Sequence, residues 1–119
     1  MEHRRLNDHR DDRGYVINPF AHLEDTGDIT NFHTFTIEPG HSRGNHLHPA
    51  RNEQVLVLAG EIEVETPAGT RTLTGLSPSI LTIPGGMEHT FTNRTEETAV
   101  VMCWSSRRDE HYQGEDTLR

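Results

Sequence analysis

The fold of this chain is decided by two stretches, Gly40-His-Ser-Arg-Gly-Asn-His-Leu-His-Pro-Ala-Arg-Asn-Glu53 and Pro84-Gly-Gly-Met-Glu-His-Thr-Phe-Thr-Asn93. In the first stretch, His46 and His48 are two residues apart, and on an extended segment such residues point to the same face. Two imidazoles then lean into one space, as a metal chelate requires. Glu53 opens the apolar run that follows, where burying an unpaired carboxylate is costly and a bound cation removes the cost.

The second stretch supplies a third imidazole. His89 follows a Pro-Gly turn and begins a Thr-Phe-Thr strand, in which His89 and Phe91 share one face. If that face is the interior of a barrel, His89 can join His46, His48 and Glu53. Three imidazoles and one carboxylate suit Fe, Mn, Zn, Ni or Cu. The expected cofactor is therefore one divalent transition metal.

The pattern outside these stretches is that of short strands. Runs rich in Val, Ile, Thr and Phe alternate with Gly, Pro, Asn and Asp clusters, and no helical period of useful length occurs between 14 and 106. The pattern predicts an all-β sandwich or small barrel over residues 14–106. The predicted strands are Tyr15–Ile17, Ile29–Ile37, Glu53–Ala59, Glu61–Thr66, Thr70–Leu73, Ile80–Ile83, His89–Thr92 and Ala99–Ser105.

Both ends of the chain are polar. Residues 1–13 are nearly all polar or charged, which predicts a solvated and poorly ordered arm. Residues 107–119 are polar as well and are expected to form a loop or a short helix. No apolar segment precedes the first strand, so no secretory signal is expected and the default location is the cytoplasm.

Composition excludes several classes of protein. The 119 residues suffice for one domain, and a formal charge of −8 argues against a nucleic-acid binder. The single cysteine, Cys103, excludes an internal disulfide framework and a zinc site built from cysteines, and it is expected to be a small buried hydrophobe. The longest apolar run, Ala99–Trp104, is too short to span a membrane. No lysine occurs, so any cationic side chain that holds an anionic substrate must be arginine.

The spacing of the two stretches resembles the two motifs of the cupin superfamily. The matches are Gly40-x5-His46-x-His48-x4-Glu53-x6-Gly60 and Pro84-x-Gly86-x2-His89-x3-Asn93. The family usually has a glycine six residues before the proline, where this chain has Pro78, and Gly75 is the candidate to replace it. The resemblance implies an all-β cupin double-stranded β-helix, or jelly-roll, barrel. It also implies an interior metal held by His46, His48, Glu53 and His89, with a polar but metal-free pocket as the alternative.

Two shorter segments narrow the resemblance. Arg43-Gly44-Asn45-His46 and Asp12-Arg13-Gly14-Tyr15 resemble segments of dTDP-sugar 3,5-epimerases and 3,4-ketoisomerases. The two motifs and the strand with Trp104 also resemble the C-terminal cupin domain of capsule-sugar enzymes that act on UDP-linked 4-keto hexoses. The resemblance implies work on nucleotide-activated sugars. Arg43 and Arg13 are the substrate-binding candidates, because a guanidinium matches the geometry of phosphate.

The epimerase mechanism does not transfer to this chain. In the metal-free epimerases the histidine of the Arg-Gly-x-His segment is the base, but here His48 and Glu53 favour metal ligation by that residue, His46. A ligated imidazole cannot also be the base. Those enzymes use a tyrosine acid on the strand after the second motif, and Ala99–Trp104 contains no tyrosine. The catalytic acid and base therefore stay unassigned.

Three functions from different classes are consistent with these residues. The first is an epimerase or isomerase that acts by metal-assisted enolisation of a keto sugar. The second is an Fe-dependent dioxygenase, since four ligands leave two open positions on an octahedral metal. The third is a non-catalytic module that binds or senses a small molecule. A homodimer is expected, because the apolar core is thin and sheet edges need covering. His33 is expected to be a hydrogen-bonded core or rim histidine, and Trp104 a core or interface residue.

The metal content should fall as the solution is acidified. Imidazole ligands must be neutral to bind a metal, so protonation below a pH of about 6 competes with binding. Elemental analysis of the protein after equilibration across a pH series measures this directly, with His46→Ala as the control. A metal content that does not change well below pH 6 would contradict imidazole ligation.

Overall fold

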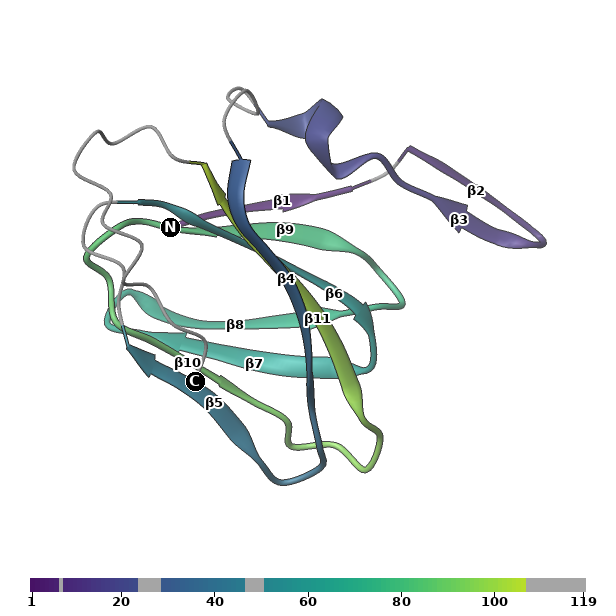
Figure 1. Cartoon of the computed structure of the whole chain (residues 1–119). Coiled ribbons are helices and arrows are strands. Elements are labelled where there is room, and N and C mark those ends of the chain that lie inside the picture. Colours follow the sequence, from purple (N-terminus) through teal and green to yellow (C-terminus); the bar gives the residue numbers. More distant parts are fainter. Residues whose placement is uncertain (7, 24–28, 47–50, 107–119) are drawn as a thin grey trace.

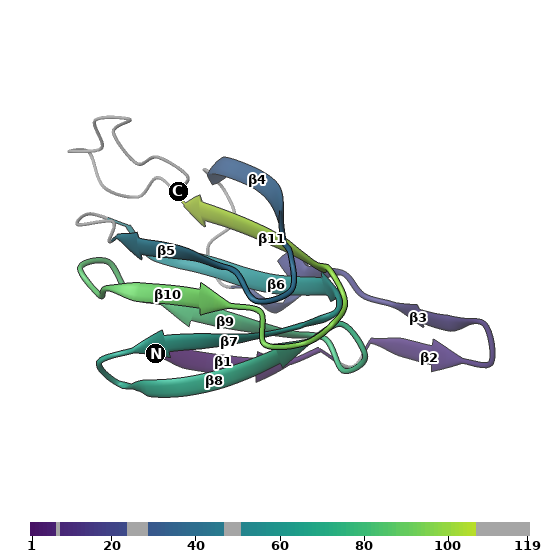
Figure 2. The same ribbon diagram turned by 90° about the horizontal axis from the view of Figure 1, so that it is seen from below.

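The structure is a computed structural model that describes residues 1–6, 8–23, 29–46 and 51–106, without the side chains at 30, 31, 45, 46 and 106. Two antiparallel sheets face each other (Figures 1 and 2). The first sheet has the order β1 (Glu2–Arg5), β9 (Ser79–Ile83), β6 (Glu53–Ala59), β11 (Ala99–Ser106) and β4 (Ile29–Ile37). The second has the order β5 (Ser42–His46), β10 (His89–Thr92), β7 (Glu61–Thr66) and β8 (Gly69–Thr74). The predicted cupin double-stranded β-helix is confirmed.

The local pattern predicts the strands well. All eight predicted strands are present, four with the predicted bounds and four with bounds that differ by one residue at one or both ends. In β7 the side chains of Ile62 and Val64 are buried while Glu61 and Glu65 are exposed, as strict alternation predicts. The fold adds three strands that the pattern did not predict, which are β1, β2 (His9–Asp11) and β5.

The central strands β6 and β11 are buried on both faces. Val55, Val57 and Cys103 belong to the core between the two sheets, whereas Leu56 and Trp104 belong to a second cluster on the outer face of the five-stranded sheet. The second cluster is enlarged by Phe20 and Phe32, whose rings lie 5.4 and 5.8 Å from the ring of Trp104. Burial on both faces explains why these strands are continuous apolar runs rather than alternating ones.

The expectation of a poorly ordered N-terminal arm is wrong for residues 2–6. Glu2–Arg5 forms β1, which pairs antiparallel with β9, and Leu6 is buried in the outer cluster. The side chains of β1 are exposed, as its polarity suggests, but the backbone covers an edge of the sheet through main-chain hydrogen bonds. Polarity alone could not show this pairing. The tail at 107–119 lies outside the described residues.

A two-stranded ribbon of β2 and β3 (Gly14–Val16) projects away from the barrel (Figures 1 and 2). A single 3-10 turn, η1 (Pro19–His22), follows the ribbon.

In the described part of the chain, no helix is long and apolar enough to cross a membrane. The two sheets end at β1 and β4 and at β5 and β8. Homodimer formation at such edges stays a prediction.

Two glycines allow strands to approach closely. A Cβ atom at Gly75 would lie 2.7 Å from the carbonyl oxygen of Leu58, so Gly75 occupies a position where a side chain does not fit. Its expected role in place of a glycine at position 78 stays a prediction. Gly44 has a φ of +108°, and a Cβ there would lie 2.8 Å from the carbonyl oxygen of His89. Gly44 therefore lets β5 lie directly against the start of β10.

Substituting alanine at Gly44 and at Gly40 should separate steric clash from backbone strain. Both glycines have positive φ, but a Cβ at Gly40 would meet no atom within 4 Å. We expect Gly40→Ala to lower the free energy of unfolding by about 1 kcal/mol and Gly44→Ala to lower it by about 1–3 kcal/mol more. Urea denaturation followed by circular dichroism measures both losses. Equal losses would show that β5 moves away from His89 at little cost.

Candidate metal centre

A buried polar pair connects the two sheets in the barrel interior. Glu53, at the start of β6, and His89, at the start of β10, are 4% and 1% exposed. The Glu53 Oε1 and His89 Nε2 atoms lie 3.0 Å apart. The strands that carry them belong to different sheets, so the pair spans the interior. The structure thus brings together two of the four side chains that the sequence proposed as metal ligands.

The hydrogen bonding of His89 determines what its Nε2 atom offers. His89 Nδ1 lies 3.0 Å from the Met87 carbonyl oxygen, and because a carbonyl only accepts, Nδ1 carries a proton. In the neutral imidazole, Nε2 is then an acceptor that faces a carboxylate oxygen, which is also an acceptor. Two acceptors at this distance require a proton or a cation between them. An imidazole whose second nitrogen donates to a backbone carbonyl is the usual arrangement of a metal ligand.

A contact between the two motif loops sets the position of this pair. The backbone N–H of Gly85 donates to Asn52 Oδ1 at 3.1 Å, so the turn before β10 is tied to the residue before Glu53. A Cβ at Gly85 would lie 2.9 Å from the carbonyl oxygen of Arg51. A glycine at this point therefore allows the turn to approach the β6 entry closely enough for His89 and Glu53 to meet.

The other two predicted ligands are described only in part. The Cα atom of His46 is the partner of His89 in the pairing of β5 with β10, next to a β-bulge. The backbone of His46 therefore lies beside the His89–Glu53 pair, while its side chain is outside the description. His48 lies outside the described residues altogether. Ligation by His46 and His48 stays a prediction.

Two residues that sequence reasoning did not assign to the site lie close to Glu53. The His33, Glu53 and Cys103 ligand atoms all lie within 4.8 Å of one another. Burial, and secondarily the charge of Glu53, raises the pKa of the Cys103 thiol well above its usual value. Cys103 is buried, as expected, but its surroundings are polar on this side. One feature of the sequence could have placed His33 in the interior. His33 and Phe35 are two residues apart on one strand, so their side chains share a face.

Arg43, one of the two substrate-binding candidates, lies between the sheets. Its Nε donates to the carbonyl oxygen of Thr36 at 2.8 Å, which connects β5 to β4. Its guanidinium carbon lies 5.8 Å from the centre of the Phe35 ring. Phe35 in turn stacks on Phe91 in the interior, with ring centres 5.9 Å apart. Phe91 lies two residues after His89 on β10, and its Cα atom is the partner of the Arg43 Cα atom in the pairing of β5 with β10.

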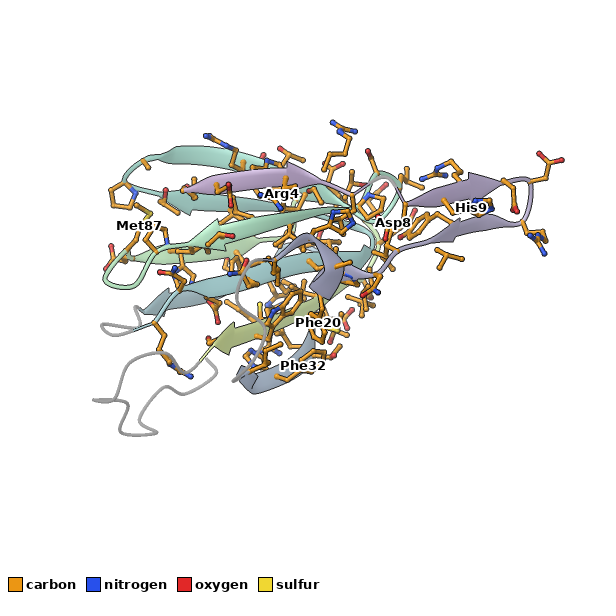
Figure 3. All side chains as sticks on the ribbon, turned by 90° about the horizontal axis from the view of Figure 1, so that it is seen from above. Arg4, Asp8, His9, Phe20, Phe32 and Met87 are labelled. Atoms are coloured by element: carbon orange, nitrogen blue, oxygen red, sulfur yellow. The ribbon has the colours of Figure 1, made fainter. Side chains whose placement is uncertain are left out.

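Arg13, the other candidate, lies at the turn of the β2–β3 ribbon. Its Nη2 contacts Asp11 Oδ2 at 2.6 Å, and its side chain is 87% exposed. Figure 3 shows His9 of the ribbon and Met87, the hydrogen-bond partner of His89, at opposite ends of the molecule. The structure therefore does not bring Arg13 to the Glu53–His89 pair of the same chain.

A surface pocket borders the start of β10. Its volume is about 220 Å³, and it is lined by Glu65, Thr66, Pro67, Glu88, His89 and Thr90. Small-molecule sites usually measure about 300–1,000 Å³, so this pocket takes only part of a nucleotide-linked sugar. Its two carboxylates, from Glu65 and Glu88, are both exposed.

Comparison with known proteins places these features in context. The model of the family described as polysaccharide biosynthesis C-terminal domain matches residues 9–117. The chain is 32% identical over 104 residues to the UDP-2-acetamido-2,6-beta-L-arabino-hexul-4-ose reductase of Pseudomonas aeruginosa. That match covers 82% of this chain and 27% of the reductase, so the chain spans about a quarter of that relative.

Solved structures show the same fold. A 3,4-ketoisomerase from Helicobacter canadensis superposes with a TM-score of 0.73 at 18% identity, covering 96% of this chain and 86% of the other. The capsular polysaccharide assembling protein CapF from Staphylococcus aureus superposes with a TM-score of 0.63 at 21% identity, covering 78% of this chain and 27% of CapF. At these identities the likeness is one of fold.

The pairing of Arg13 with Asp11 predicts a lowered pKa for the Asp11 carboxyl group. The side-chain hydrogen bond from Arg13 is the main cause that holds the pKa of Asp11 at about 2. The stabilising effect of this ionised carboxylate is present above its ordinary pKa of about 3.9 and is lost as the pH falls through about 2. We expect an NMR titration of the Asp11 carboxyl carbon to show this midpoint, and Arg13→Gln to raise it. His9→Ala, which removes a weaker contact, should raise it less. A wild-type midpoint near 3.9 would show that Arg13 is not engaged with Asp11.

Proposed function

This chain belongs to the polysaccharide biosynthesis C-terminal domain family, and on that premise we propose that it is a metal-dependent epimerase or isomerase of a nucleotide-linked keto sugar. The observation that carries the proposal is the buried Glu53–His89 pair, in which an imidazole nitrogen and a carboxylate oxygen lie 3.0 Å apart. A buried site of this kind is costly unless it holds a cation or a proton. Together with His46 and His48, the pair would hold a divalent transition metal.

The relatives support the substrate class. The Pseudomonas aeruginosa relative carries a UDP-linked hexul-4-ose, which is a keto sugar, in its name. The Helicobacter canadensis protein of the same fold is named as a 3,4-ketoisomerase. The reductase activity of the first relative is not part of the proposal, because this chain matches only about a quarter of that protein.

The chemistry of the proposed reaction determines what the residues must do. Removing a proton next to a ketone leaves negative charge on oxygen, and a bound divalent metal would supply the Lewis acid that stabilises it. The Nδ1–H group of His89 donates a hydrogen bond to the Met87 carbonyl oxygen, which fixes the orientation of the ring. His89 therefore positions the site and does not act as the acid or base. The proton must therefore pass through other groups. The Glu65 and Glu88 carboxylates, which line the pocket beside His89, are the candidates.

Arg43 is the first candidate for binding the anionic part of the substrate. It is half-buried, and its hydrogen bond to Thr36 orients the guanidinium near the interior aromatic rings. A guanidinium forms paired hydrogen bonds with phosphate oxygens. Arg13 lies on the projecting ribbon and would need a different arrangement to take part. We therefore expect Arg43→Gln to raise KM more than it lowers kcat.

The proposal is tested by proton exchange. Metal-loaded protein is incubated in deuterated water with UDP- and dTDP-linked 4-keto sugars, and mass spectrometry measures deuterium in the sugar. We expect deuterium at the carbon next to the ketone, because the enolisation step exchanges that proton. His89→Ala and Glu53→Gln should reduce exchange at least about 100-fold, whereas chelation should remove it in the wild type.

Glu61→Gln is the matched control, since Glu61 is an exposed carboxylate at the other end of β7 from Glu65. It should exchange at the wild-type rate. Absence of exchange across both nucleotide series would overturn the isomerase proposal. Binding of the sugar without exchange would favour the non-catalytic module, and oxygen consumption by the Fe(II)-loaded protein would favour the dioxygenase.

A further inference from the structure

We propose that His33, Glu53 and Cys103 form a second donor set, which binds a thiophilic divalent cation such as Zn²⁺ through nitrogen, oxygen and sulfur. This set is called the thiol cluster below. It goes beyond the proposed function, which uses neither His33 nor Cys103. The two donor sets share Glu53, whose carboxylate has two oxygens and can serve both.

The strand pairing places the cluster on the inner face of the five-stranded sheet. Cys103 on β11 is the Cα partner of His33 on β4 and of Val55 on β6. Glu53 is two residues from Val55 and shares its strand face. Three adjacent strands therefore each present one donor, and their main-chain hydrogen bonds keep the three backbones at constant spacing. The His33 ring is further held by stacking on Phe35, with ring centres 5.8 Å apart.

The donor atoms of the cluster lie at most about 1–1.5 Å farther apart than those around a bound zinc ion. The three ligand atoms lie within 4.8 Å of one another. Zinc bonds of about 2.0–2.3 Å at tetrahedral angles place donor atoms about 3.3–3.8 Å apart. Side-chain rotations that move the donor atoms by about 1 Å bring them to bonding distance of one ion, and no strand has to move. Imidazole, carboxylate and thiolate together select a borderline or soft cation over Mg²⁺ or Ca²⁺.

A nucleophilic role for Cys103 fits the structure less well. A reactive cysteine needs a lowered pKa and access to solvent, whereas burial and Glu53 raise the pKa of this buried thiol. The thiol therefore keeps its proton until a cation replaces it. On binding, the S–H bond breaks, a sulfur–metal bond forms and the proton leaves to the buffer.

Cobalt is the probe for this cluster. Co²⁺ is added to the metal-free chain of 119 residues, and absorbance is recorded in the near ultraviolet, where thiolate-to-cobalt charge transfer appears. Imidazole and carboxylate ligands give no such band, so the signal reports sulfur ligation and needs no enzymatic activity. We expect the wild type to show the band. We expect His33→Ala to weaken Co²⁺ binding at this position at least about tenfold, since even outer-shell partners of a metal contribute about 10- to 100-fold.

Variants identify the donor of the band. Cys103→Val, which keeps an apolar side chain of similar size in the core, and Cys103→Ala should both lack it. Val101→Ala is the matched control for a core cavity, because Val101 is buried two residues earlier on the same strand. It should keep the band. Circular dichroism verifies the fold of each variant before titration, and whichever Cys103 variant folds is used.

The outcomes separate this proposal from the proposed function. A band that is absent from the wild type at saturating Co²⁺, or that persists in a folded Cys103 variant, would overturn the thiol cluster. The band should survive in His89→Ala, which removes a ligand of the other donor set. A band without sugar proton exchange would support the cluster and remove the isomerase, whereas exchange without a band would do the reverse.

Discussion

A buried carboxylate and a buried imidazole face each other across the interior of this barrel, and the rest of the structure accommodates that contact. Neither Glu53 nor His89 is stable in an apolar core by itself, because charged and polar groups lose their hydration there. The two meet at 3.0 Å, with the second nitrogen of His89 engaged by the Met87 carbonyl. In this geometry an imidazole nitrogen faces a carboxylate oxygen, and a proton or a cation between them makes the contact favourable.

Several features far apart in the sequence serve this contact. The Gly85 amide and the Asn52 side chain tie the two motif loops together, and Gly44 lets the β5 backbone lie against His89. Around the pair, His33, Phe35 and Phe91 form a row of stacked rings inside the barrel. The outer face of the five-stranded sheet is covered separately, by Trp104 and the rings of Phe20 and Phe32. Figure 3 labels the two phenylalanines. Apolar packing on both faces keeps β6 and β11 rigid, and these strands carry Glu53 and Cys103.

The proximity of Glu53 and His89 was predictable because strand periodicity and motif spacing place both on interior faces. The burial of Cys103 was expected from the sequence. The identity of its neighbours was not, because the register of three strands decides which residues lie side by side. The β1 strand was missed for a related reason: its side chains are polar, and its stability comes from backbone pairing with β9. Arg13 belongs to a segment that resembles a motif of sugar-nucleotide enzymes, but it lies on a ribbon that projects from the barrel. Asp11 pairs with Gly14 there, so Arg13 stands in the turn between β2 and β3.

The sequence by itself determined eight of the described strands and their inward faces, because alternation and turn residues are local properties of the chain. It also predicted the donor types of a metal site. It also determined that the cationic side chains are arginines, since no lysine occurs. Only the tertiary structure decided which polar groups share a space. That choice depends on sheet order, cross-strand register and the close approach of backbones at glycines, all of which involve residues distant in the chain. For this reason Glu53 has the expected His89 on one side and the unexpected His33 and Cys103 nearby.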